Sequence, residues 1–290
     1  MSSIGQDLIE LAKTGSLSPL IGREKELERI FRVLGRFKEG HVLLVGEAGV
    51  GKTSLVKGLA FQISRGAMPV TALTQVKQSE FADFILNPSR LLTLSENQAL
   101  PSILYVSQFD RLVEFAGNSG RFASIYDLLN HPAYRLIAAV TPQGLQRMKD
   151  TERALVSRFQ AIAVNEPDDT GTIQILRGLK ISYEQYHRGW IDDSALEMAV
   201  ILSERYLPEQ KQPSKALGLL DEACSLVAMR RPNPVEVAAL EQEKVSGEEE
   251  AEIEDLIIHS PVTAFEVTEV AADITGQTVE DLERELDAEE

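Results

Sequence analysis

The stretch HVLLVGEAGVGKTSLVKGLA, residues 41–60, decides the fold of this chain. Its first five residues form a short apolar run, which predicts a buried strand. Residues 46–53, GEAGVGKT, match the pattern G-x-x-x-x-G-K-[ST], and helical periodicity follows them. Strand, glycine loop and helix is the order in which this pattern forms a phosphate-binding loop. A glycine loop that served only as a tight turn would not require the Lys-Thr pair.

Each residue type in this loop has a physical task. The glycines let backbone N–H groups curl around phosphate oxygens at the start of a helix. Lys52 can reach the outer phosphates, and the hydroxyl of Thr53 can ligate magnesium. We therefore expect ATP and Mg²⁺ as ligands. The loop residues expected to contact the nucleotide are Gly46, Glu47, Ala48, Gly49, Val50, Gly51, Lys52, Thr53 and Ser54.

Three more apolar runs predict the rest of a sheet. They are Ile103–Val106, Arg135–Val140 and Ala161–Val164, and helical stretches separate them. Strands that alternate with helices indicate a doubly wound α/β fold with a parallel sheet, whose ligands bind at the carboxyl ends of the strands. From Pro167 to about Met229 the pattern is helical only, which predicts an all-helical subdomain.

The changes of pattern along the chain predict four parts. We expect residues 1–167 to form the α/β nucleotide-binding subdomain and residues 168–231 to form the helical subdomain. Residues 232–261 are expected to be an acidic linker. Residues 262–290 are expected to be a C-terminal helical segment, with a helix that Gly276 ends.

The charge of the chain is concentrated at one end. The formal net charge is −16, and residues 232–290 hold 19 acidic residues against Lys244 and Arg284, a net of −17 that leaves +1 for the rest. This distribution argues against binding to nucleic acid. The first residues lack the apolar core of a signal peptide, and no apolar run reaches the ~18 residues that span a membrane. Cys224 is the only cysteine, so we expect a reducing cytoplasm.

Three segments are similar to the first ATPase domain of the ClpA, ClpB and ClpC unfoldases. They are DLIELAKTGSLSPLIGREKELERIFRVLGR, GEAGVGKTSLVKGLA and ILSERYLPEQKQPSKALGLLDEA. The resemblance runs from about Gln6 to Met229, and VTAFEVTEVAADITGQTV resembles the stretch that leads those proteins into their second ATPase ring. It implies a P-loop AAA+ fold with a helical lid. It also implies a hexameric machine that binds ATP between subunits and pulls polypeptides through a central pore.

The resemblance assigns roles to residues outside the glycine loop. Leu20, Ile21 and Gly22 match the segment that lines the adenine pocket. Thr141 matches sensor 1, which positions the attacking water near the γ-phosphate. The alternative for Thr141 is a hydroxyl that caps a turn at the end of a strand.

Two basic residues also match the family. Arg158, in ALVSRFQ, matches one of a pair of arginine fingers, and Lys215 matches the lid motif that closes over the nucleotide. The resemblance thus makes Thr141 and Arg158 candidate catalytic residues and Lys215 a candidate nucleotide contact. The alternatives are a surface salt bridge for Arg158 and simple exposure to solvent for Lys215.

The chain departs from the family at the hydrolysis site. The family has an Asp-Glu pair directly after the second strand, where this chain has Ser107-Gln108. The Asp would hold magnesium through water, and the Glu would polarise the attacking water, a task that needs a carboxylate. Serine and glutamine cannot take up a proton at pH 7. Asp110 would be a substitute if the strand bulged.

Other family features are missing as well. The first arginine of the pair is replaced by Ser157, so that only Arg158 remains. No Lys/Arg-Tyr-x-Gly loop that would grip a substrate is visible in residues 69–103, and Phe81 and Phe84 are spaced for a helix face. We expect no second ATPase domain, and therefore no loop that docks the ClpP protease.

Three hypotheses follow from this combination. The first is an ATP-binding, hydrolysis-impaired module that acts as a regulator, adaptor or assembly scaffold. Its partner would be a protein, either a Clp-type ATPase or further copies of the chain in a ring. The second is a working ATPase that remodels proteins, with catalysis by Asp110 or by a partner subunit. The third is an interaction protein whose phosphate loop no longer binds nucleotide.

Overall fold

The structure of the protein is a computed structural model that describes residues 5–17, 20–80, 85, 100–230 and 261–288. The chain divides into two compact units, Met1–Glu166 and Pro167–Glu290, which we call the α/β unit and the helical unit. Phe81, Phe84 and all of the acidic linker except Pro261 lie outside the described residues. In the described part of the chain, no helix combines the length and the apolar character needed to cross a membrane.

A sheet of six strands lies at the centre of the α/β unit, as far as the structure describes it. The strands are β1 (Gln6–Asp7), β2 (His41–Val45), β3 (Leu73–Val76), β4 (Ser102–Val106), β5 (Tyr134–Val140) and β6 (Phe159–Ala163). Their order is β1-β3-β4-β5-β2-β6, and all pairs are parallel except β1 with β3. The doubly wound fold and the four predicted strands are confirmed. The sequence analysis missed β1 and β3, which have no long apolar run.

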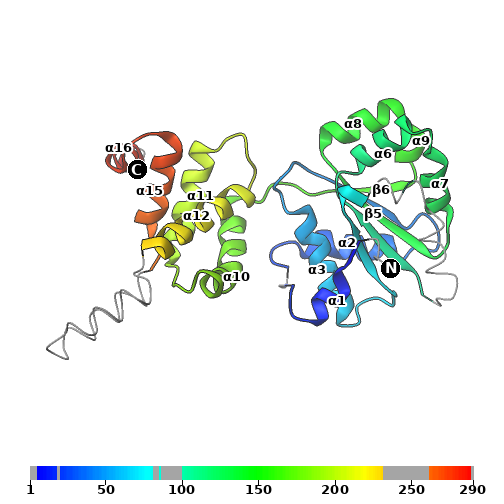
Figure 1. Cartoon of the computed structure of the whole chain (residues 1–290), viewed down its shortest axis with the longest axis horizontal. Helices are drawn as coiled ribbons and strands as arrows, with labels where there is room; N and C mark the ends of the chain where they lie inside the picture. The colour runs from blue at the N-terminus through cyan, green and yellow to red at the C-terminus, as the bar shows by residue number, and fades with distance from the viewer. Residues whose placement is uncertain (1–4, 18–19, 81–84, 86–99, 231–260, 289–290) are drawn as a thin grey trace. The chain divides into compact units, whose positions relative to one another are not determined.

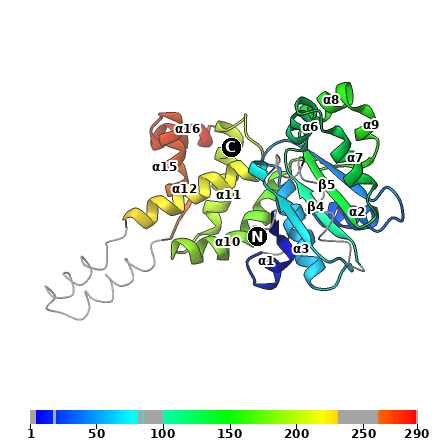
Figure 2. The same cartoon turned by 45° about the vertical axis from the view of Figure 1, so that its right-hand side comes forward.

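Helices cover both faces of this sheet, and Figures 1 and 2 show the two layers from different sides. One layer consists of α1 (Leu8–Lys13), α2 (Glu24–Leu34) and α3 (Lys52–Ser64), and the other of α6 (Phe109–Asn118), α7 (Phe122–Asn130), α8 (Pro142–Thr151) and α9 (Arg153–Val156). Side chains alternate along each strand, so that Leu44 and Tyr105 pack in the first core and Leu43 and Leu104 in the second. Because both of their faces are buried, the central strands β2, β4 and β5 consist mainly of apolar residues.

Five helices share one core in the helical unit. They are α10 (Asp169–His187), α11 (Asp193–Tyr206), α12 (Ser214–Arg230), α15 (Ala264–Thr275) and α16 (Val279–Asp287), counted over the described residues. Four of them begin with a side-chain cap on the N-cap residue, such as Asp168, whose carboxylate accepts from the N–H of Gly171 at 2.7 Å. These caps satisfy the N–H groups that a helix leaves unpaired at its start.

The C-terminal segment packs more closely than the sequence suggests. The predicted helix that Gly276 ends is present as α15, with Gly276 in the left-handed conformation at its end. However, the apolar side chains of α15 and Leu282 of α16 belong to the same core as α10 to α12. The backbone of Val262 also bonds to Trp190 and Asp192, both at 2.8 Å. Residues 262–288 are therefore a structural part of the helical unit, because α15 buries its apolar face there.

Candidate functional site

The candidate site lies where β2, β4 and β5 end. Because these strands are parallel, the loops that follow them meet at one edge of the sheet. There they enclose a small cavity of about 210 Å³. It is lined by Ala48, Lys52, Thr53, Tyr105, Ser107, Gln108, Asp110, Ala139, Val140 and Thr141. The fold thus brings the glycine loop, the Ser-Gln pair and Thr141 together, as the sequence analysis expects.

Glycine is needed at two positions of the phosphate-binding loop. The N–H of Gly46 donates to the carbonyl oxygen of Val140 at 3.2 Å. A Cβ atom on Gly46 would lie 2.3 Å from the carbonyl oxygen of Val164, so any side chain would push the loop out of place. Gly51 has φ +97°, a left-handed conformation that turns the chain into α3. The loop is therefore held against the ends of β5 and β6.

Lys52 points its ammonium group back over the loop. Its Nζ donates to the carbonyl oxygens of Gly46 and Glu47, both at 2.7 Å. Burial lowers the pKa of Lys52, and the nearby charges of Glu47 and Asp110 oppose this effect. A cation held this way lies at the place where the outer phosphates of a nucleotide bind in loops of this pattern.

The hydroxyl of Thr53 has a partner that the sequence analysis missed. Its Oγ1 lies 2.9 Å from the phenol oxygen of Tyr105, which is fully buried in β4. Burial raises the pKa of Tyr105, so the phenol keeps its proton. If the phenol donates to Thr53, one lone pair of Oγ1 is left for a metal ion. Thr53 thus fits a magnesium ion that arrives with a nucleotide.

A magnesium site built from the protein alone is not supported by the described residues. No group of three or more His, Cys, Asp or Glu side chains lies close together in them. Ser107 and Gln108 line the cavity where the family places its Asp-Glu pair, and both are neutral. Mg²⁺ would therefore depend on Thr53, water and the phosphates of the nucleotide for its ligands.

The backbone of Gln108 has an uncommon conformation. Its φ of 54° and ψ of 48° are left-handed, which is rare for a residue other than glycine, asparagine or aspartate. The residue stands directly before the first residue of α6 and makes no side-chain cap. The turn between β4 and α6 therefore holds Gln108 in a strained geometry at the cavity wall.

Asp110 also reaches the cavity. It lies in the first turn of α6, and its Oδ2 accepts a hydrogen bond from Arg147 of α8 at 2.7 Å. A Cβ atom on Gly144 would come within 2.6 Å of the same Oδ2, so the glycine leaves room for the carboxylate. Asp110 is thus a carboxylate that lines the cavity but is ion-paired with α8.

Thr141 both caps a helix and lines the cavity. Its Oγ1 accepts from the N–H of Gly144 at 3.0 Å and so starts α8, as the alternative interpretation of this residue has it. The capping bond uses a lone pair of the oxygen and leaves the hydroxyl proton for another acceptor. The sensor role therefore stays a prediction that is compatible with the cap.

The segment from Leu20 to Gly22 is fixed by a residue that follows it. Leu20 packs so closely on α3 that a Cβ atom on Gly58 would lie 2.5 Å from the Cβ of Leu20. Arg23, which is 9% exposed, donates to the carbonyl oxygens of Val50 at 3.2 Å and Asn165 at 2.6 Å. The sequence analysis missed Arg23, because its partners lie 27 and 142 positions further along the chain.

Arg158 lies away from this cavity. It directly precedes β6, and its guanidinium donates to the side-chain oxygen of Asn130 at the end of α7. The first residues of parallel strands lie on the opposite edge of the sheet from the phosphate-binding loop. Arg158 therefore cannot contact a nucleotide in its own cavity, and the hydroxyl of Ser157 beside it donates to the carbonyl oxygen of Ala154 at 2.8 Å.

Lys215 is in the helical unit and is not exposed. Its side chain is 2% accessible, and its Nζ lies 2.5 Å from the carboxylate of Glu204 in α11. A hydrogen bond from Lys215 is the main cause that lowers the pKa of Glu204. The alternative of simple exposure to solvent is therefore wrong. The lid role of Lys215 stays a prediction.

Two family models match the chain. The model described as AAA ATPase domain matches residues 19–204, and the model described as AAA lid domain matches residues 168–258. The first covers the phosphate-binding loop, the Ser107-Gln108 turn and Thr141. The second begins where the helical unit begins.

Curated relatives and solved structures agree with these matches. The chain is 36% identical to the chaperone protein ClpB of Yersinia enterocolitica over 250 residues, which are 81% of this chain and 28% of that protein. It is 34% identical over 269 residues to the ATP-binding subunit ClpC of the Clp protease of Staphylococcus aureus strain USA300, 87% of this chain and 33% of ClpC. The Saccharomyces cerevisiae Hsp104-ADP complex matches with a TM-score of 0.76 at 28% identity, over 96% of this chain and 46% of Hsp104. A closed-state structure of Hsp104 with ATPγS and casein matches with a TM-score of 0.77 at 28% identity, over 94% of this chain and 45% of that one. The chain thus spans about a third or less of the length of these curated relatives.

Proposed function

This chain belongs to the AAA ATPase domain family, and we propose that it is a member that binds ATP with magnesium but hydrolyses it slowly. It is an AAA+ ATPase module of the Clp type. One observation carries the proposal: the cavity that is lined by Lys52 and Thr53 is also lined by the neutral pair Ser107 and Gln108. The phosphate-binding residues Lys52 and Thr53 belong to α3, whereas Ser107 and Gln108 follow β4. A chain can therefore keep the groups that bind ATP without those that hydrolyse it.

The binding half of the proposal rests on the glycine loop. Its N–H groups at the start of α3 would surround the phosphates, and Lys52 would exchange its two backbone carbonyls for phosphate oxygens. Magnesium, when bound, would neutralise charge between the outer phosphates, and Thr53 would hold it. Leu20, Ile21 and Gly22 would line the adenine side, and Arg23 fixes this segment to the loop through Val50.

The slow-hydrolysis half rests on the chemistry of the Ser-Gln pair. A positioned general base is typically worth about 10²–10⁴-fold in rate. The amide of Gln108 can orient a water molecule by hydrogen bonds but cannot accept its proton. Bound ATP should therefore remain largely unhydrolysed, as an assembly signal requires.

A second candidate function is an active ATPase, and the position of Asp110 favours it. This carboxylate lines the same cavity and carries an oxygen that could receive a proton. Against this, its Oδ2 is bound to Arg147, and the side chain is directed to α8 at Gly144. Asp110 would have to leave this ion pair to serve as the base.

The position of Arg158 supports action between subunits. A guanidinium at the edge opposite the phosphate-binding loop can meet a γ-phosphate only in a neighbouring molecule. The proposed partner is a protein, either another copy of this chain or a Clp-type ATPase. In this proposal Thr141 contacts the attacking water and Lys215 belongs to the lid of the helical unit.

The test is a comparison of binding with turnover on the same purified protein. We expect Mg-ATP to bind, as measured by calorimetry, while steady-state phosphate release stays far below the ~1–10³ s⁻¹ of ordinary enzymes. Binding with ordinary turnover that is lost in Asp110→Asn would establish the second candidate. A protein that binds no Mg-ATP would support neither.

A further inference from the structure

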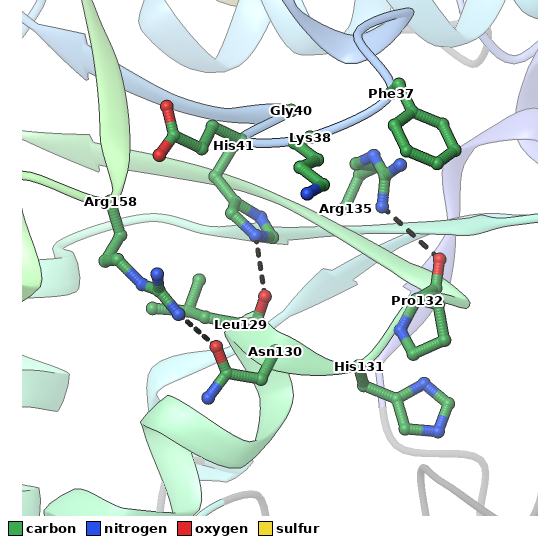
Figure 3. Close-up of a pocket in the computed structure, with 11 residues that line it drawn as sticks. Phe37, Lys38, Gly40, His41, Leu129, Asn130, His131, Pro132, Arg135 and Arg158 are labelled. Carbon is green, nitrogen blue, oxygen red and sulfur yellow. Dashed lines mark hydrogen bonds between the residues drawn. The ribbon is translucent and has the colours of Figure 1, made fainter.

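A second and larger hollow lies on the opposite edge of the sheet. Its volume is about 610 Å³, within the range of small-molecule sites. Its walls are the segment before β2, the turn between α7 and β5, and the residue before β6, and Figure 3 shows them as sticks. The lining residues are Phe37, Lys38, Glu39, Gly40, His41, Leu129, Asn130, His131, Pro132, Arg135 and Arg158. Most of these residues lie at the N-terminal ends of the strands, whereas the residues of the nucleotide cavity lie at the carboxyl ends.

Positive charge dominates this hollow. Lys38, Arg135 and Arg158 line it, against a single carboxylate, that of Glu39. Figure 3 shows Arg158 on one side of His41, with Lys38 and Arg135 on the other. Several positive charges around a concave surface add up to a positive electrostatic potential that attracts anions.

Arg135 has a buried donor without a partner. Its Nη1 donates to the carbonyl oxygens of Pro132 at 3.3 Å and Tyr134 at 3.1 Å. Its Nε is buried and has no hydrogen-bond partner among the residues that the structure describes. Gly40 makes room for this side chain, because a Cβ atom there would lie 2.7 Å from the Nε. The close packing of Gly40 on this buried atom holds the side chain of Arg135 at the wall of the hollow.

His41 contributes no charge to the hollow. Its Nδ1 accepts from the N–H of Leu136 at 3.1 Å, and its Nε2 lies 2.9 Å from the carbonyl oxygen of Leu129. The proton therefore sits on Nε2 and is donated to Leu129, so both nitrogens are used within the protein. The cationic character of the site comes from Lys38 and the two arginines.

An aromatic ring completes the site. The side chain of Phe37 is 92% exposed, although it borders the hollow. In Figure 3 its ring is drawn beside the guanidinium of Arg135. An exposed aromatic face can stack on a nucleobase, which is favourable for any base.

We propose that this hollow binds a polyphosphate group, held by Lys38 and Arg135, while Arg158 adds positive charge at its rim. The ligand is separate from the nucleotide of the phosphate-binding loop, because the two cavities lie at opposite ends of the same strands. Nucleoside polyphosphates and inorganic polyphosphate share this chemistry, and Phe37 distinguishes them, since only the former present a base to its ring.

The experiment isolates this site in the Lys52→Ala protein, which lacks the main phosphate contact of the loop. Tripolyphosphate without Mg²⁺ is titrated into it by calorimetry. We expect binding that Lys38→Gln and Arg135→Gln each weaken about tenfold or more, as loss of a charge-assisted hydrogen bond predicts. Lys149→Gln is the matched control, because this exposed lysine of α8 does not line the hollow and should leave the affinity unchanged.

Two further variants sharpen the result. Gly40→Ala keeps every charge but displaces Arg135, so it should also weaken binding. ATP that binds more tightly than tripolyphosphate, with the difference removed by Phe37→Ala, identifies a nucleoside ligand; equal affinities identify the phosphate chain alone. The proposal is overturned if the Lys52→Ala protein binds no tripolyphosphate, or if its binding is unchanged in both Lys38→Gln and Arg135→Gln. Lys38 is exposed, so its replacement tests the site without the loss of a buried contact.

Discussion

The hydroxyl oxygens of Thr53 and Tyr105 lie 2.9 Å apart and connect the start of α3 to the interior of β4. Thr53 is the expected magnesium ligand, and Tyr105 is fully buried beneath it. The position of this hydroxyl is therefore set by the core of the α/β unit as well as by the glycine loop. A buried hydrogen bond of this kind typically contributes about 0.5–1.5 kcal/mol.

The first prediction concerns this pair. Tyr105→Phe should lower the free energy of unfolding by about 1 kcal/mol, because it leaves Thr53 without its partner. Thr53→Val should have a similar cost, and the double variant should cost less than the sum. Urea unfolding without nucleotide measures all three. Strictly additive costs would mean that the two hydroxyls do not interact.

Lys52→Ala should abolish Mg-ATP binding at the phosphate-binding loop, because the ammonium is the main point charge of the loop. At 100 times its dissociation constant, a ligand specific for the folded state adds about 2.7 kcal/mol of stability. The wild type should therefore melt at a visibly higher temperature with Mg-ATP, and Lys52→Ala should lose the part of this shift that the loop supplies. Lys57→Ala, an exposed lysine on the same helix, is the control and should keep the full shift. A shift of undiminished size in Lys52→Ala would contradict the assignment.

Restoring both carboxylates should raise ATP turnover more than restoring one. Ser107→Asp supplies the water-mediated magnesium partner and Gln108→Glu supplies the base, and groups that serve one reaction act non-additively. Phosphate release should increase most in the double variant, within the ~10²–10⁴-fold that a general base contributes. A double variant no faster than Gln108→Glu alone would show that Ser107 does not limit the reaction.

Arg158→Ala should weaken ATP-dependent association of the protein. The side chain lies on the edge opposite its own nucleotide cavity, so its contribution needs a neighbouring subunit. Sedimentation with and without ATP measures the effect. Arg153→Ala, an exposed arginine in α9, removes the same charge nearby and should change little. Equal sedimentation of wild type and Arg158→Ala would refute the proposed role between subunits.

Acid should destabilise the α/β unit through His41. Burial lowers the pKa of this histidine, a hydrogen bond to Leu129 opposes the shift, and the charges of Arg135 and Arg158 lower it further. As pH falls below about 6.5, the unfolded chain takes up a proton that the folded protein refuses, so the free energy of unfolding decreases. Above that pH the effect is absent. His41→Gln should show a shallower loss of stability between pH 7 and pH 5, and equal slopes would exclude this cause.

The glycine loop and most of the sheet could be predicted from the pattern of residues alone. Gly46, Gly51, Lys52 and Thr53 lie within eight consecutive residues, because a phosphate-binding site of this pattern needs only one loop and the start of one helix. The four longer strands were also predictable, since burial on both faces requires continuous apolar runs. The neutral pair Ser107 and Gln108 could be located without the structure, because its position follows directly from the end of a predicted strand.

Contacts between side chains that lie far apart along the chain become visible only in the folded protein. Tyr105 reaches Thr53 from 52 positions away, and Asp110 reaches Arg147 from 37 positions away. Such contacts leave no periodic signal in the sequence, because each partner alone looks like a core or surface residue. The same holds for the segment 262–288, whose helices look independent until their apolar faces are seen to need the core of the helical unit. The chemistry of a short motif can thus be predicted from its spacing in the sequence. The placement of Arg158 and of the cationic hollow depends on the parallel sheet, which separates the ends of its strands from their beginnings.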